Sequence, residues 1–125
     1  MANKPVANAA DRPVMLSADS ARRVGRMLSA YEGGDRAITP YVVPNGFTDG
    51  GDAEPVRLCK TTAAWSKNTT ATLNVWEDGT PPNETQTAGE TIEDVVNKFA
   101  AVATGKFCMI AKAANGSWYL IAAEC

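Results

Sequence analysis

The sequence has no histidine and no apolar run of the length that a membrane-spanning helix needs. Without histidine, the chain lacks an imidazole base for catalysis and the side chain that most often binds zinc or haem. Charged residues make up 21% of the 125 residues, and the formal net charge is −2 at pH 7. A protein that binds nucleic acid usually has an excess of basic residues. We therefore expect no nucleic-acid partner, no membrane partner and no cofactor.

Cysteine is scarce as well, because the chain has only Cys59, Cys108 and Cys125. An odd and widely spaced set is not a disulfide framework, and three scattered thiols without histidine are poor zinc ligands. Cys59 and Cys108 lie in apolar, strand-like segments, which predicts buried free thiols. The first residues, MANKPVANAADRP, lack the apolar core of a signal peptide. We therefore expect the chain to fold in a reducing cytoplasm.

The N-terminal part of the sequence predicts an arm over residues 1–16 followed by a helix over residues 17–32. Ser17 is a good N-cap, Asp19 suits the first turn, and a glycine pair follows the helix. The apolar positions Ala21, Val24, Leu28 and Tyr31 form a narrow seam, with arginines on the other faces. Such a helix is marginal by itself and needs a partner surface.

The helix is also the main candidate for partner binding. Its apolar seam is suited to self-association, and its arginines either dock on an acidic protein surface or form a solvated polar face. The predicted partner-binding residues are Arg22, Arg23, Val24, Arg26, Leu28 and Tyr31.

The remaining sequence predicts a glycine- and proline-rich linker over residues 33–55, in which residues 41–44 could form a short edge strand, and a β-rich domain over residues 56–125. Strand patterns occur at 56–62, 69–77, 106–112 and 117–124, with an Asn115-Gly116 hairpin between the last two. Residues 90–105 have helical spacing of apolar side chains and predict a helix inside this domain. The expected fold class is α+β: arm and helix (1–32), linker (33–55), and a small, mainly antiparallel β domain with one helix (56–125).

No catalytic or metal-binding residues are identified, and we do not expect an enzyme. The acidic residues Glu90, Glu93 and Asp94 fall at the start of the expected second helix, where capping explains them. Tryptophan offers one further possibility, because Trp76 and Trp118 could stack on sugar rings as a glycan-binding site. The alternative for Trp65 and Trp118 is a role as core or subunit-interface anchors.

Two stretches carry a family resemblance. Residues 20–36, SARRVGRMLSAYEGGDR, resemble the opening segment SARR-x-x-R-x-x-x-x-x-E-G-x-x-R of small structural proteins of tailed bacteriophages and prophages. Residues 57–125 resemble the C-terminal module of the same proteins. The shared positions are Lys60-Thr61-Thr62, Trp65, the strand that ends at Val75, Gly79-Thr80-Pro81, Asn97-Lys98-Phe99, Gly105-Lys106 and the final residues 118–125.

The resemblance implies a component of the virion, folded in the host cytoplasm before assembly. It implies a capsid decoration or head-fibre protein first, and a neck or tail adaptor or fibre component as the alternative. The expected partners are further copies of the chain, with a trimer suggested by phage architecture, and other virion proteins. A glycan-binding, receptor-facing module remains a different hypothesis from the same sequence.

Overall fold

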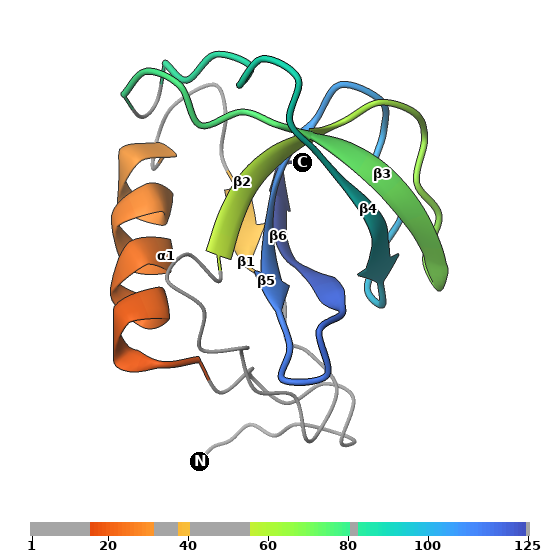
Figure 1. The fold of residues 1–125 in the computed structure, drawn as a ribbon, viewed down its shortest axis with the longest axis horizontal. Coiled ribbons are helices and arrows are strands. Elements are labelled where there is room, and N and C mark those ends of the chain that lie inside the picture. The colour runs from red at the N-terminus through yellow and green to blue at the C-terminus, as the bar shows by residue number, and fades with distance from the viewer. Residues whose placement is uncertain (1–15, 32–37, 41–55, 81–82, 125) are drawn as a thin grey trace.

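A computed structural model of the protein describes residues 16–31, 38–40, 56–80 and 83–124 (Figure 1). They form one helix and six strands. In chain order these are α1 (Ala18–Tyr31), β1 (Ile38–Pro40), β2 (Val56–Thr61), β3 (Thr69–Val75), β4 (Thr91–Asn97), β5 (Phe107–Lys112) and β6 (Trp118–Glu124).

Strands β2 to β6 close into a five-stranded barrel. The antiparallel strands β2, β3 and β4 follow one another, and β5 then returns to pair with the other edge of β2, which is a Greek-key arrangement. Strand β6 makes a hairpin with β5 and closes the barrel through a parallel contact to β4 at Tyr119 and Val96. The same edge of β6 pairs further along with β1, at Ala122 to Glu124.

Two apolar clusters stabilise this arrangement. The inner cluster fills the barrel with side chains from all five barrel strands: Cys59, Trp65, Leu73, Val75, Val95, Val102, Cys108, Ile110, Leu120 and Ala123. The outer cluster lies between the barrel and α1: Met27, Tyr31, Val56, Leu58, Phe107, Met109, Ala111, Ala113, Ile121 and Ala122. Strands β2, β5 and β6 contribute to both clusters, so they are buried on both faces, whereas β3 and β4 expose one face to solvent.

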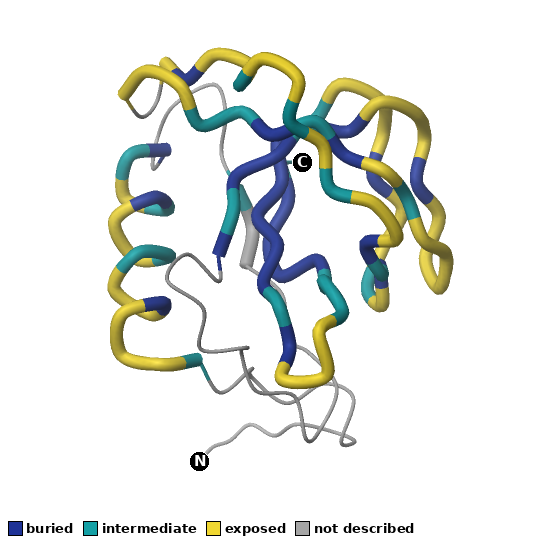
Figure 2. The backbone as a smooth tube through the Cα atoms, in the orientation of Figure 1, coloured by how far each residue is buried: buried dark blue, intermediate teal, exposed yellow. Residues whose placement is uncertain are grey.

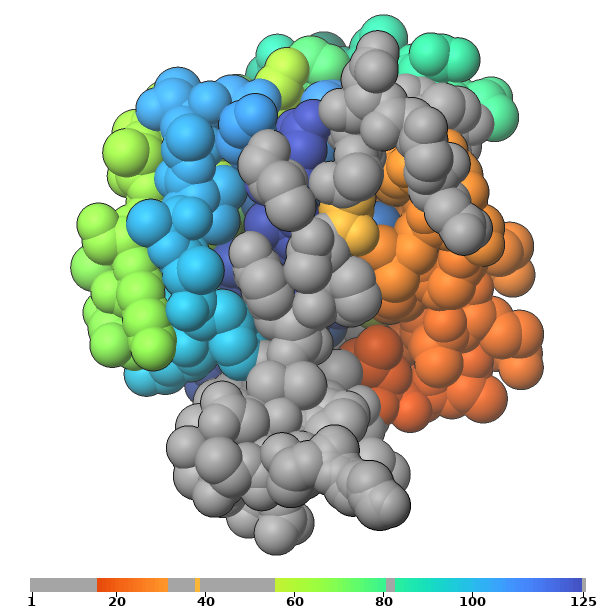
Figure 3. Space-filling view, turned by 180° about the vertical axis from the view of Figure 1, so that it is seen from behind, coloured from red at the N-terminus to blue at the C-terminus, as the bar shows by residue number. Residues whose placement is uncertain are grey.

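The predicted N-terminal helix is present. Ser17 caps it by accepting a hydrogen bond at Oγ from the backbone N–H of Ser20, at 3.2 Å. Its buried side, with Met27 and Tyr31, faces the barrel, and its opposite side is exposed (Figure 2). Ile38 of β1 packs on the same outer cluster, and β1 is seen beside α1 from behind (Figure 3). The partner surface that the helix needs is therefore the barrel of its own chain.

The helix expected over residues 90–105 is wrong, because the structure has strand β4 there. The strand register shifts between Ala71 and Leu73 of β3, so Val95 pairs with Ala71 and Ile92 pairs with Leu73. Glu93 and Asp94 of β4 lie opposite the single residue Thr72 of β3, so β4 has one extra residue here, and Asp94 adopts a φ of 58°. The bulge places Ile92 and Val95 on the same face three residues apart, a spacing that imitates a helix.

The other elements of the β domain are confirmed. The strands predicted near residues 56–62, 69–77, 106–112 and 117–124 are β2, β3, β5 and β6. The hairpin turn is closed by a hydrogen bond from Ala113 N to Ser117 O, at 2.8 Å, and Gly116 has the positive φ that such turns use. All of the predicted arm except Leu16, most of the predicted linker and the candidate strand at 41–44 lie outside the described residues.

Candidate functional site

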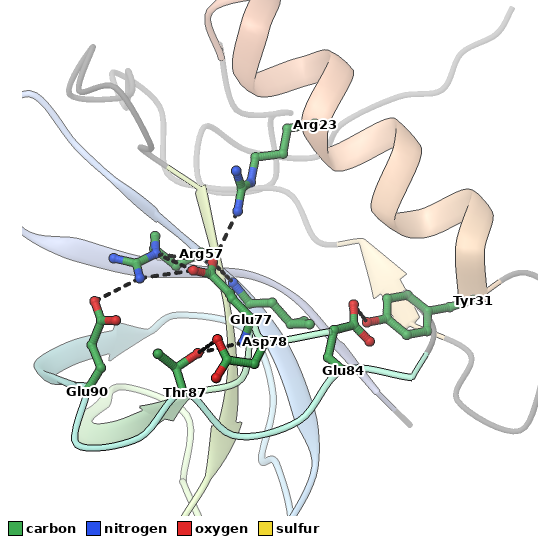
Figure 4. Close-up of polar contacts among 9 residues, drawn as sticks. Arg23, Tyr31, Arg57, Glu77, Asp78, Glu84, Thr87 and Glu90 are labelled. Atoms are coloured by element: carbon green, nitrogen blue, oxygen red, sulfur yellow. Dashed lines mark hydrogen bonds and ion pairs between the residues drawn. The ribbon is translucent and has the colours of Figure 1, made fainter. Parts of the chain in front are cut away.

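A network of charged and polar side chains joins α1 to the barrel and to the loop between β3 and β4 (Figure 4). The loop begins where β3 ends at Val75 and reaches over the C-terminal end of α1 (Figure 1). The network contains Arg23 and Tyr31 from the helix, Arg57 from β2, and Glu77, Glu84 and Glu90 from the loop.

Glu77 is the centre of the network. Its Oε1 accepts a hydrogen bond from Arg57 Nε at 3.0 Å and forms an ion pair with Arg57 Nη2 at 2.9 Å. Its Oε2 accepts from the backbone N–H of Leu58 at 2.9 Å and from Arg23 Nη2 at 3.1 Å. The Glu77 side chain is only 18% exposed, so these contacts are partly shielded from water. One carboxylate thus links α1, β2 and the β3–β4 loop.

Arg57 extends the network toward the start of β4. Its Nη2 lies 2.8 Å from Glu90 Oε2, and its side chain is 17% exposed. Burial by itself lowers the pKa of Arg57, but the hydrogen bonds and charges of Glu77 and Glu90 outweigh burial and raise it. Arg57 therefore remains charged, and its role is to hold two carboxylates that come from the two ends of one loop.

A second contact fixes the end of the helix. The Tyr31 hydroxyl donates a hydrogen bond to Glu84 Oε2 at 2.6 Å, and both residues are almost fully buried. In Figure 4 this pair lies apart from the contact between Arg23 and Glu77. The loop is therefore attached to the helix at two separate points.

Between these two points lies a cavity of about 370 Å³. Its lining residues are Arg23, Arg26, Met27, Leu58, Glu77, Gly79 and Glu84. Met27 and Leu58 supply apolar surface, while the charged side chains supply guanidinium groups from the helix and carboxylates from the loop. The volume lies within the range of small-ligand pockets, about 300 to 1,000 Å³.

The structure divides the predicted partner-binding residues among three environments, and Arg23 is the half-buried residue that pairs with Glu77. Tyr31 is 1% exposed, and Val24 and Leu28 pack partly against the outer cluster, so these apolar residues contact the barrel. Arg22 and Arg26 are exposed, and Arg22 pairs with Asp19 on the outer surface of the helix. Whether the exposed arginines bind a partner stays a prediction.

The tryptophans also differ from one another. Trp65 is buried in the inner cluster, as the core alternative predicted, and Trp118 packs partly against the same cluster. Trp76 is half-buried and meets Phe107 edge to face, with ring centroids 5.3 Å apart. The Lys60 ammonium lies 4.1 Å from the Trp76 ring centroid. A sugar that stacked on this face of Trp76 would have to displace Lys60.

Cys59 and Cys108 are buried free thiols, as predicted, and they face each other across β2 and β5. Burial raises the pKa of both thiols above its ordinary value, so they stay protonated and unreactive at neutral pH. In the described part of the chain, no three cysteine, aspartate or glutamate residues come together as metal ligands. Among the same residues, no helix is long and apolar enough to cross a membrane.

A five-stranded Greek-key barrel is also the architecture of the OB-fold, whose second and third strands bind oligonucleotides. The strands in that position here are β3 and β4. Their solvent-exposed residues include Glu93 and Asp94 but no lysine or arginine, the opposite of what phosphate groups require. The shared architecture therefore carries no functional argument.

Sequence reasoning missed the Glu77 network and the cavity beside it. A partial signal was present, because Arg57 lies inside an apolar strand and a charge in that position needs a partner. Glu77 lies two residues after the end of the neighbouring strand, β3. The sequence alone does not reveal that the β3–β4 loop folds back over the helix and brings Glu84 to Tyr31.

No protein-family model, no curated protein and no solved structure matches the chain. Its function must therefore be inferred from its residues, its fold and the resemblance described above.

Proposed function

We propose that the protein is a structural protein of a bacteriophage virion, a capsid decoration or head-fibre component that assembles as a homo-oligomer on the particle. A neck or tail adaptor or fibre component is the alternative position in the same class of particle. The proposal rests on the resemblance of residues 20–36 and 57–125 to structural proteins of tailed phages. It places the folded chain in the virion and gives it other virion proteins as partners.

The structural observation that supports this role most is that the partly buried charged residues bind one another and hold the fold together. Glu77, Arg57 and Glu90 bind one another and fix a long loop across the helix and barrel. A carboxylate that already accepts hydrogen bonds from two arginines and a backbone N–H is poorly suited to proton transfer. The same arrangement suits a protein that must keep its shape within an assembly.

The surface proposed for anchoring to the particle is the exposed side of α1 together with residues 1–15. The helix itself cannot act as a detachable anchor without exposing part of the outer cluster, since Met27 and Tyr31 are buried there. Each of these side chains contributes about 1.5 to 3 kcal/mol by its burial. A useful truncation therefore removes residues 1–15 and keeps the helix.

The proposal is tested in the host strain that carries the gene. The chromosomal copy is deleted, epitope-tagged chain is supplied in trans, and particles are purified on a density gradient and probed with antibody. We expect the full chain in the particle fractions and a strongly reduced amount of the chain that lacks residues 1–15. Circular dichroism of the truncated chain controls for its folding. Absence of the full chain from the particles would overturn the proposal, and full incorporation of the truncated chain would overturn the anchoring role.

A further inference from the structure

We propose that the cavity between α1, β2 and the β3–β4 loop is a binding pocket for an apolar group that carries a carboxylate. Arg26 would bind the carboxylate, and Met27 and Leu58 would contact the apolar part. This inference does not depend on the proposed function, because it concerns the isolated chain and can be tested on it.

The first argument is the position of the lining side chains on the helix. Arg23, Arg26 and Met27 are three and four residues apart, so they lie on one face of α1. That face borders the cavity, whose other lining residues come from β2 and the β3–β4 loop. The cavity therefore has cationic groups on one wall and the apolar side chains of Met27 and Leu58 beside them.

The second argument is which of the charged lining side chains already have a hydrogen-bond or ion-pair partner. Arg23 lies 3.1 Å from Glu77, and Glu77 also binds Arg57. Glu84 accepts a hydrogen bond from Tyr31 at the far end of the helix. Among the described residues, Arg26 is the charged lining side chain for which no hydrogen bond or ion pair is found. A ligand that enters this cavity therefore meets an available guanidinium.

The third argument is that the cavity combines a guanidinium group with an apolar lining. An arginine binds a carboxylate through two parallel N–H donors, which fixes the orientation of the ligand. Met27 and Leu58 are the apolar side chains that line the cavity, so an apolar group that enters it and contacts them would lose contact with water. A free aliphatic or aromatic acid and the side chains of an acidic, apolar peptide segment share this chemistry.

The experiment titrates the isotope-labelled full chain with three probes and follows the backbone amide resonances. The probes are 4-phenylbutyrate, the uncharged 4-phenylbutan-1-ol, and an end-capped peptide with leucine between two glutamates. We expect the acid or the peptide to shift the resonances of Met27, Leu58 and Gly79 and to bind more tightly than the alcohol. Tighter binding of the acid would indicate a small-molecule ligand, and tighter binding of the peptide would indicate a protein segment.

Arg26→Gln is the decisive variant, with Arg22→Gln as the matched control on the same helix. Both side chains are exposed, and Arg22 bonds Asp19 rather than lining the cavity. We expect Arg26→Gln to weaken binding about tenfold or more, and Arg22→Gln to leave it unchanged. The proposal is overturned if neither anionic probe binds, if the alcohol binds as well as the acid, or if the two variants have equal effects.

Discussion

At the scale of single residues, Glu77 joins three parts of the fold. Its carboxylate binds Arg23 of the helix and both Arg57 and the backbone of Leu58 on β2. Because the side chains of Glu77 and Arg57 are 18% and 17% exposed, water replaces these contacts poorly if one partner is removed. The charge of Arg57 would then be left partly buried without its main partner.

We therefore expect Glu77→Gln to lower the free energy of unfolding by about 2 to 3 kcal/mol, less than for a fully buried pair because solvent still reaches the site. Urea denaturation measures this change. Asp19→Asn is the matched control, since it breaks the exposed pair with Arg22 and removes an acid from the first helical turn, and it should cost at most about 1 kcal/mol. Equal effects of the two substitutions would contradict the role assigned to Glu77.

The two buried thiols make the free energy of unfolding fall as the pH rises. In the folded protein burial raises the pKa of Cys59 and Cys108, whereas in the unfolded chain a thiol titrates near pH 8.5, to within about a unit. Above that pH the unfolded chain binds fewer protons than the folded one. The stability that the two protonated thiols contribute is therefore complete below about pH 8.5 and is lost progressively as the pH rises above it.

We expect the free energy of unfolding to fall above pH 9 by up to about 1.4 kcal/mol per pH unit for each buried thiol. Urea denaturation at pH 7, 9 and 10.5 measures the slope. The double variant Cys59→Ala/Cys108→Ala should show a shallower slope, whatever its stability at pH 7. An unchanged slope would mean that the two thiols are accessible to hydroxide in the folded protein.

The environment of a single residue could be predicted from the sequence where it depends only on the neighbouring residues in the chain. The thiols of Cys59 and Cys108 lie in apolar strands, and burial follows from that composition. The pairing of Arg57 with Glu77 and Glu90 was not predictable, because these residues are 20 and 33 positions apart and meet only after the loop has folded back.

At the scale of elements, the bulge in β4 explains both the local geometry and the wrong helix prediction. Asp94 has a φ of 58° and an exposed side chain, so its backbone is strained while its side chain is solvated. The strand also contains three β-branched residues, which favour strands: Ile92, Val95 and Val96. The apparent helical spacing concealed this preference. The spacing came from one inserted residue, and the sequence has no separate signal for such an insertion.

The bulge predicts an order of stability for substitutions at position 94. Asp94→Gly removes the strain and should stay within about 1 kcal/mol of the original protein, because glycine adopts positive φ freely but is more flexible when unfolded. Asp94→Val should lose about 1 to 2 kcal/mol, since a β-branched residue is poorly tolerated at this φ. Thermal denaturation measures both. Glu93→Val, at the exposed neighbouring position, should not destabilise the strand, and a loss equal to that of Asp94→Val would argue against the bulge.

The attachment of α1 to the loop gives a prediction at the same scale. Tyr31→Phe removes the hydroxyl that donates to Glu84, which is 6% exposed. We expect a loss of about 1 to 3 kcal/mol, because a buried carboxylate loses a donor. Hydrogen exchange should speed up in α1 and in residues 83–87 more than in β5. Ser29→Ala, on the exposed side of the helix, is the control and should change neither the free energy of unfolding nor the rates of hydrogen exchange. Uniform acceleration of exchange across the barrel would contradict a local attachment.

For the whole molecule, the sequence gives the right class of elements but not their arrangement. Alternating and continuous apolar stretches predicted β2, β3, β5 and β6, since each strand has enough apolar residues to be recognised alone. Closure of the barrel depends on one parallel contact between β4 and β6 and on the return of β5 to β2. Such long-range pairings leave no local pattern, and neither does the packing of the helix on the barrel.

We propose that the folded chain is a component of a phage particle. Quantitative mass spectrometry across a density gradient tests this proposal by comparing the copies of this chain with those of the major capsid protein. We predict a constant ratio through successive purification steps, with many copies per particle for a decoration or fibre protein and few for a neck or tail component. A ratio that falls to background as the particles become purer would contradict the claim.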